Sequence, residues 1–233
     1  MDTLEEGYGI SLSPLMKFAL DIYADDPCER FLPRLMEENL SPREIDVMAK
    51  MHKAMAVILF KLEGQLIERN PDMHMEARRM MDRVDYEKGT VRLGDTEYPM
   101  TDVRFPTVLP SDPYALSGEE QELVDKLRDE FYRSMKLQQH VRFLYEKGGI
   151  YLCCNGNLLY HGCVPSTPEG EFTKVRIGGK YYAGKALFDK ADAMARQAYL
   201  AKWGTEERVK GLDFLWYLWC GEHSPLFGKD RMT

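Results

Sequence analysis

The chain has 233 residues, of which 44% are hydrophobic and 11% aromatic, an ordinary composition for a globular protein. Its formal charge is -7, and basic residues are interspersed with acidic ones without a Lys/Arg block, which argues against nucleic-acid binding and against long-range attraction of an anionic substrate. The longest apolar run is too short to cross a bilayer, the start does not resemble a signal peptide, and the five cysteines lack disulfide-type spacing. We therefore expect a cytoplasmic protein with no membrane partner.

Residues 1–115 are expected to form a helical subdomain with one small hairpin. Prolines divide residues 1–40 into short helices. Ser41-Pro42-Arg43-Glu44 matches a capping box with proline at the first helical position, and the helix that it starts is expected to run about seven turns to Asn70-Pro71. One seam of this helix is expected to face a partner helix of the same chain or, as the less favoured option, a second subunit. Its members are Ile45, Met48, His52, Met55, Leu59, Leu62 and Leu66. We interpret His52 as a partly buried packing residue rather than a ligand.

The next segment contains a hairpin, a loop and a second capped helix. The string "GTVRLGDTEYPM" predicts a hairpin that turns at Gly94-Asp95, and prolines mark 103–117 as a loop. Ser117-Gly118-Glu119-Glu120 is a second capping box. The helix that follows has an apolar face that offers a partner for the long helix: Leu123, Leu127, Phe131, Met135 and Leu137.

Residues 116–233 are expected to form a mixed α/β part. The runs "IYLCC" and "NLLYHGC" are typical of short strands buried on both faces. The string "KVRIGGKYYAG" predicts a hairpin with Gly178-Gly179 at its turn, which disfavours a phosphate-cradling loop there. Residues 185–203 predict an amphipathic helix whose inward set is Ala186, Leu187, Ala193, Met194 and Leu200. Trp216 and Trp219 are expected in the core of a short final helix.

Common catalytic motifs are missing from the sequence, and one Cys/His group has to be weighed. Cys153, Cys154, His161 and Cys163 do not show zinc-knuckle spacing, and adjacent cysteines on a strand point to opposite faces. Two buried thiols that act as small hydrophobic side chains are therefore favoured over a zinc site. A nucleophilic role for Cys163 is weak, because His161 lies two residues away in an unhelpful direction.

His161 is the better candidate for chemistry. It is expected at the carboxyl end of a strand, where α/β folds place ligands, and Gly162 allows another group to approach the backbone closely. From the residues alone, contact with a metal or substrate and a structural role are equally open. His223 lies in a predicted loop, where contact with substrate or metal is the less favoured interpretation, and Glu222 beside it is similarly open.

The strings "NGNLLYHGCVPSTPEGEF", "GKALFDKADAMARQAYLAK" and "DFLWYLWCGEHSPLFGKDRMT" closely resemble the class III fructose-1,6-bisphosphatases of bacteria. The opening "GYGISLSPL" resembles the same family, so that the resemblance covers essentially the whole chain. It implies a calcineurin-like α/β/β/α sandwich, of which this chain would form an α+β part with a helical insertion. It also implies manganese dependence and removal of the 1-phosphate of fructose 1,6-bisphosphate, a small-molecule sugar bisphosphate, in gluconeogenesis.

The resemblance also implies roles for individual residues. "LLYHGCVPS" resembles the segment in which a strand delivers a histidine to the dinuclear metal centre, so His161 would be a metal ligand. "GKDRMT" resembles, more loosely, a segment whose arginine binds the substrate phosphate, which would assign Arg231 to substrate binding. His223 is a further candidate for substrate binding because of its predicted loop position. The family's GDxHG-like, GDxxDRG-like, GNHD-like and GHxP-like motifs do not occur here.

Without those motifs the chain is interpreted as an internal fragment with little or no activity of its own, because two metal ions need several ligands each. The alternative is a helical interaction or regulatory domain without catalysis, and a third hypothesis is a zinc module built on the Cys/His group. Buried strands that lack neighbours would leave open edges, so association into a homo-oligomer is also expected.

Overall fold

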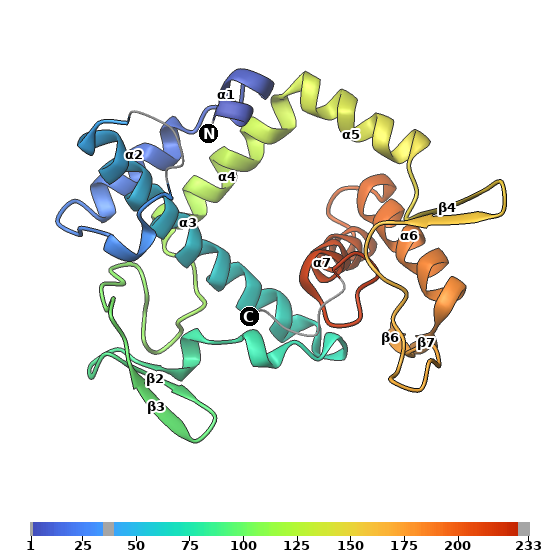
Figure 1. The fold of residues 1–233 in the computed structure, drawn as a ribbon. Coiled ribbons are helices and arrows are strands. Elements are labelled where there is room, and N and C mark those ends of the chain that lie inside the picture. Colours follow the sequence, from blue (N-terminus) through green and yellow to red (C-terminus); the bar gives the residue numbers. More distant parts are fainter. Residues whose placement is uncertain (1, 35–39, 228–233) are drawn as a thin grey trace. The chain divides into compact units, whose positions relative to one another are not determined.

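The structure is a computed structural model that describes residues 2–34 and 40–227 (Figure 1). The chain forms two compact units, each built from two stretches: Met1–Gln65 with Ala77–Gln139, and Leu66–Glu76 with His140–Thr233. Helices and small antiparallel sheets make up both, so the fold is α+β. The inserted subdomain over residues 1–115 stays a prediction. The two units are defined by contacts inside this chain, and such contacts do not test an insertion into a longer protein.

The described elements, in chain order, begin with the helices α1 (Asp2–Tyr8), α2 (Ser13–Ile22), η1 (Glu29–Phe31), α3 (Pro42–Arg69), η2 (Pro71–Met73), η3 (Glu76–Arg78) and η4 (Met81–Arg83). A three-stranded sheet follows, with β1 (Val84–Asp85), β2 (Thr90–Leu93) and β3 (Thr96–Pro99) in that order. The remaining elements are α4 (Gly118–Arg133), α5 (Met135–Lys147), β4 (Tyr151–Cys154), β5 (Asn157–Tyr160), β6 (Val175–Ile177), β7 (Lys180–Tyr182), α6 (Gly184–Leu200) and α7 (Glu206–Cys220). Within the described ranges, no helix is both long and apolar enough to span a membrane.

Two capped helices begin where the sequence predicts. The Ser41 N–H donates to Glu44 Oε2 at 2.7 Å, and the Glu44 N–H donates back to Ser41 Oγ at 3.3 Å. The same reciprocal bonds join Ser117 and Glu120 at the start of α4. Each box satisfies two backbone donors that a helix start leaves without a partner, so local sequence decides both boundaries. The predicted end of α3 before Asn70 is also confirmed.

The predicted inward seam of α3 is wrong over its middle. Met55 and Leu59 are 37% and 43% exposed, and His52 is exposed with its Nδ1 3.1 Å from the Phe31 carbonyl oxygen. The buried face lies to the side of this seam and carries Ala54 and Ile58, which pack in the core with α2. Aliphatic residues occur around much of this helix, so spacing alone does not select the face that is covered.

Two lysines belong to that buried face. The ammonium group of Lys53 is fully buried and lies 2.6 Å from Asp26 Oδ2 and 2.7 Å from Asp102 Oδ1. Burial alone would raise the pKa of Asp26, but the hydrogen bonds from Lys53 and from the Cys28 N–H outweigh it, so the pKa lies below its usual value. Burial also raises the pKa of the Cys28 thiol to about 12. These groups therefore act as a satisfied ionic cluster of the first unit.

The second lysine, Lys61, is paired with Glu120, and both side chains are fully buried. Lys61 Nζ lies 2.6 Å from Glu120 Oε2 and donates to the Thr107 carbonyl oxygen at 2.7 Å. Glu120 also accepts the Thr107 hydroxyl at 2.6 Å and the Ser117 N–H at 2.7 Å. Glu120, which belongs to the capping box of α4, is thus also the counter-ion of Lys61 on α3.

The apolar face predicted for α4 is only partly correct. Leu123 is buried and Leu127 packs against the same core, whereas Phe131 and Met135 are exposed. The helix ends at Arg133, and Ser134 separates it from α5. The two helices therefore do not share one continuous face.

The strands β4 and β5 form an exposed hairpin, and the prediction of strands buried on both faces is wrong. Asn155 and Gly156 both have positive φ (49° and 77°), as a two-residue hairpin turn requires. Leu152 and Leu159 are 59% and 54% exposed. The expectation of buried thiols fails with it, because Cys153 and its neighbour Cys154 are exposed. The Asn-Gly turn pairs the two apolar runs with each other. At the base of the hairpin Tyr151 and Tyr160 pack edge-on against Phe188 of α6, while the leucines and cysteines stay exposed.

Helices α6 and α7 pack together and form the core of the second unit with strand β6. Leu187 and Met194 are buried as predicted, whereas Ala186, Ala193 and Leu200 are exposed. Close approach of the helices depends on Gly211, because a Cβ there would lie 2.5 Å from the backbone nitrogen of Ala198. Trp216 is partly buried and packs against the core as predicted, whereas the core position predicted for Trp219 is wrong, because that side chain is 63% exposed.

Both predicted short hairpins are present. Strands β2 and β3 pair across Gly94-Asp95, with β1 as an additional strand, and β6 pairs with β7 across Gly178-Gly179. On β6, Val175 and Ile177 are buried against α6 and α7. Because side chains alternate between the two faces of a strand, Arg176 between them is exposed. This hairpin borders the cavity described next.

Candidate functional site

His161 lies where the sequence places it, directly after strand β5, and its side chain is exposed. The close approach expected at Gly162 is confirmed: a Cβ there would lie 2.3 Å from the Pro225 carbonyl oxygen, which accepts the Cys163 N–H at 3.1 Å. The approaching group is therefore the chain's own loop. Metal ligation by His161 stays a prediction, and no cluster of three or more His, Cys, Asp or Glu side chains that could hold a metal occurs in the part of the chain that the structure describes.

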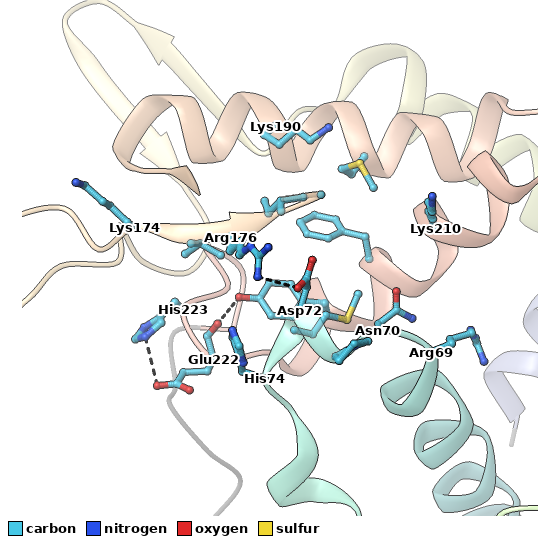
Figure 2. Close-up of a pocket in the computed structure, with 18 of the residues that line it drawn as sticks. Arg69, Asn70, Asp72, His74, Lys174, Arg176, Lys190, Lys210, Glu222 and His223 are labelled. Atoms are coloured by element: carbon cyan, nitrogen blue, oxygen red, sulfur yellow. Dashed lines mark hydrogen bonds and ion pairs between the residues drawn. The ribbon is translucent and has the colours of Figure 1, made fainter. Parts of the chain in front are cut away.

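The second unit contains a cavity of about 690 Å³, which borders His223. We call it the basic pocket and define it by its charged lining: Arg69, Lys174, Arg176, Lys190, Lys210, Asp72 and Glu222. Five cations thus face two carboxylates in a chain whose net charge is -7. Figure 2 shows these side chains around the cavity. Arg231, the predicted phosphate-binding residue, lies outside the described residues.

Four separate segments deliver the lining of the basic pocket. The end of α3 and the turn η2 contribute Arg69 and Asp72, and strand β6 with the residue before it contributes Arg176 and Lys174. Helix α6 contributes Lys190, and α7 with the loop after it contributes the remainder. Pro71 starts η2 immediately after α3 ends, because proline cannot continue that helix. The packing of η2 on β6 brings the first two segments together.

Arg69 is committed to a structural pair. Its Nε and Nη2 donate to the two oxygens of Asp213 at 2.8 and 2.6 Å, and the Asn70 amide donates to the same carboxylate at 2.7 Å. Asp213 is buried, so this bidentate contact satisfies a carboxylate that would otherwise be costly to bury. Arg69 therefore ties the end of α3 to α7 and is the least available cation of the pocket.

The other cations are less committed. Arg176 Nη1 lies 3.0 Å from Asp72 Oδ1, and both side chains are about half exposed. Lys210 pairs with the strongly exposed Glu206 at 2.6 Å. Lys174 and Lys190 have no carboxylate partner within the described part of the chain, and Lys190 Nζ lies 6.0 Å from the centre of the Tyr182 ring.

The floor of the pocket is aromatic and apolar. The rings of Phe214 and Tyr217 stack with their centres 5.4 Å apart, and both residues are buried. Burial raises the pKa of the Tyr217 phenol well above its usual value, and its hydroxyl donates to the Glu222 carbonyl oxygen. Gly221 is required here, because a Cβ would lie 2.3 Å from the Tyr217 ring. These contacts hold the loop that carries His223, whose Nε2 lies 3.3 Å from Glu222 Oε1.

This arrangement is suited to binding an anion. Lysine and arginine side chains are donors without acceptors, and an apolar floor strengthens their hydrogen bonds to an anion by lowering the local dielectric. The pocket is not evident from the sequence, because its cations are spread from residue 69 to residue 210 and form no block. The signal in the sequence that could have indicated the pocket is the pair Lys174 and Arg176, which alternates with the apolar residues Val175 and Ile177 on a predicted strand.

Comparisons with known proteins agree over the full chain. Residues 1–233 match the family described as Firmicute fructose-1,6-bisphosphatase. The chain is 48% identical over 233 residues to the fructose-1,6-bisphosphatase class 3 of Clostridium novyi (strain NT), covering 100% of this chain and 35% of that protein. It is 48% identical to the class 3 protein of Clostridium botulinum (strain Alaska E43 / Type E3), covering 36% of it, and 49% identical to one from Clostridium beijerinckii, covering 35%. The chain thus spans about a third of the length of these relatives. No solved structure matches.

Proposed function

Since the chain belongs to the Firmicute fructose-1,6-bisphosphatase family, we propose that it works as part of a phosphoric monoester hydrolase that converts fructose 1,6-bisphosphate to fructose 6-phosphate and phosphate. The observation that carries this proposal is the family match over residues 1–233. In the reaction, water adds to the phosphorus of the 1-phosphate, the ester P–O bond breaks, and the sugar oxygen leaves as a hydroxyl after gaining a proton. The comparisons favour this function over a helical interaction domain without catalysis.

We propose manganese as the cofactor and His161 as one ligand, on the strength of the resemblance alone. The described residues do not by themselves fit a dinuclear centre, because they hold no group of three or more metal-binding side chains and His161 is exposed. Two metal ions that share a site need several oxygen and nitrogen ligands each. The proposal therefore requires ligands from a longer protein, which would also complete the two-sheet sandwich typical of calcineurin-like phosphatases.

The setting proposed for this activity is gluconeogenesis in the cytoplasm. The five cysteines, which all lie among the described residues, form no disulfide, and this fits a reducing compartment. We also propose that the exposed β4–β5 hairpin supports association of the chain with itself, because its strand edges are unpaired and apolar. Sedimentation velocity on the chain and on a Leu159→Lys variant tests this: equal molecular masses for the two would contradict it.

The activity is tested by measuring phosphate release from fructose 1,6-bisphosphate with and without Mn²⁺. We compare this 233-residue chain with a protein completed to the length of the Clostridium relatives, and with the His161→Ala form of each. We expect turnover only in the completed protein, and a large loss on removal of His161. Enzyme-like turnover by the chain alone, or an unchanged rate in the completed His161→Ala protein, would contradict the corresponding part of the proposal.

A further inference from the structure

We propose that the basic pocket is a binding site for a small molecule that carries a phosphate group, with Lys174, Arg176 and Lys190 as the groups that hold the phosphate. Nothing in the predicted metal centre is needed for this binding, because His161 does not line the cavity. Only the choice of a sugar bisphosphate as one probe rests on the proposed function.

Two lysines of the basic pocket have no counter-ion among the described residues. Lys174 and Lys190 have no carboxylate partner in the described ranges, and they line one cavity from different elements (Figure 2). Like charges around one cavity repel one another, which costs stability unless an anion is present. The whole-chain charge of -7 does not favour an anion, so any affinity has to come from this local cluster.

Arg176 is held by a carboxylate partner that a phosphate can replace. Asp72 lies 3.0 Å from the guanidinium, and the side chains of this pair are 40% and 49% exposed. Exposed pairs of this kind contribute little to stability, so the guanidinium can be taken over by a stronger acceptor. A phosphate dianion offers more charge and more acceptor oxygens, and the planar guanidinium matches it with two parallel donors. Asp72 therefore acts as a competitor that an incoming phosphate displaces from Arg176.

The size of the basic pocket suits a small ligand rather than a polymer. The cavity volume of about 690 Å³ lies within the usual range for small-molecule sites, which is roughly 300–1,000 Å³. The stacked rings of Phe214 and Tyr217 line it beside the cations. The carbon skeleton of a metabolite can pack on these rings while its phosphate meets the cations.

Binding is tested on the full 233-residue chain by isothermal titration calorimetry with EDTA present, so that metal-dependent binding does not contribute. The probes are inorganic phosphate, fructose 6-phosphate, fructose 1,6-bisphosphate and uncharged fructose. We expect the sugar phosphates to bind at a 1:1 ratio and fructose not to bind. Tighter binding of the sugar phosphates than of inorganic phosphate identifies an ester as the ligand, whereas equal affinity identifies free phosphate.

Three variants assign the binding to the pocket. Lys190→Gln is expected to weaken phosphate-ester binding at least tenfold, whereas Lys185→Gln on the same helix, outside the pocket, is expected to change it less than twofold. Asp72→Asn is expected to tighten binding severalfold, because it removes the competitor, and this gain cannot come from loss of folding. Equal effects of the two lysine variants, weaker binding by Asp72→Asn, or no binding of any phosphate probe would overturn the proposal. The completed protein's turnover is a separate readout, so failure here is distinguishable from failure of the proposed catalysis.

Discussion

Replacing Lys61 with methionine tests whether the buried pair with Glu120 stabilises the first unit. The variant keeps a side chain of similar length but removes the charge, which leaves a fully buried carboxylate without its counter-ion. Breaking a buried ion pair in this way costs about 3–5 kcal/mol. Glu120 would still accept the Thr107 hydroxyl and the Ser117 N–H, so we expect the lower end, about 3 kcal/mol.

The assay has to report on the first unit alone. The three tryptophans, Trp203, Trp216 and Trp219, all lie in the second unit, so their fluorescence serves as an internal control. Hydrogen exchange of the α4 amides and of the α3 amides up to Gln65, read by mass spectrometry, reports on the first unit. Because 1.4 kcal/mol corresponds to a factor of ten, we expect exchange there to be roughly a hundredfold faster in Lys61→Met, with the tryptophan transition unchanged.

Two further variants can refute this reasoning. Lys126→Met removes an exposed pair with Glu122 at 3.5 Å and is expected to cost less than about 1 kcal/mol. The double variant Lys61→Met with Glu120→Leu removes both buried charges and is expected to recover stability, apart from about 1 kcal/mol for the lost cap. Equal exchange rates in Lys61→Met and Lys126→Met, or a double variant less stable than Lys61→Met, would show that the buried pair is not what stabilises this unit.

Three other predictions follow from the same structure. The lowered pKa of Asp26 means that its charged form contributes stability above about pH 4, the unfolded value, and loses it as the pH falls through the folded pKa; circular dichroism should show that Asp26→Asn flattens this acid limb, and parallel profiles would contradict it. Gly211→Ala should destabilise the second unit by about 2 kcal/mol, because its Cβ would lie 2.5 Å from an α6 backbone nitrogen, while Gly118→Ala, which meets open space, should not lower the melting temperature. Cys153 and Cys154 should react with a maleimide in the native protein and the buried thiols only after unfolding, which mass spectrometry of the labelled chain checks.

Features decided by neighbouring residues were predictable from the sequence. Both capping boxes satisfy donors within four residues, so the starts of α3 and α4 follow from local chemistry. The Gly94-Asp95 and Gly178-Gly179 turns likewise pair strands that adjoin them. The same reasoning could have found the Asn155-Gly156 turn of the β4–β5 hairpin, whose signal was outweighed by the apolar character of the two runs.

Which face of an element is buried could not be predicted in the same way. In α3, aliphatic residues flank the predicted seam, and two lysines that look solvent-facing by charge are covered because carboxylates from distant segments neutralise them. For β4 and β5, an apolar run indicates burial only if another element covers it, and that is a property of the surroundings. Trp219 is exposed for the same reason.

Contiguous residues were enough to predict the starts of α3 and α4, the end of α3, the Gly94-Asp95 and Gly178-Gly179 hairpins, and the resemblance that the family match confirms. The ionic core of the first unit and the basic pocket of the second exist only once the chain has folded. Lys61 and Glu120 are 59 residues apart, and Asp72 and Arg176 belong to segments that meet only when η2 packs on β6. Charges far apart along a chain affect one another only after folding brings them within a few ångströms, since water and salt screen them until then.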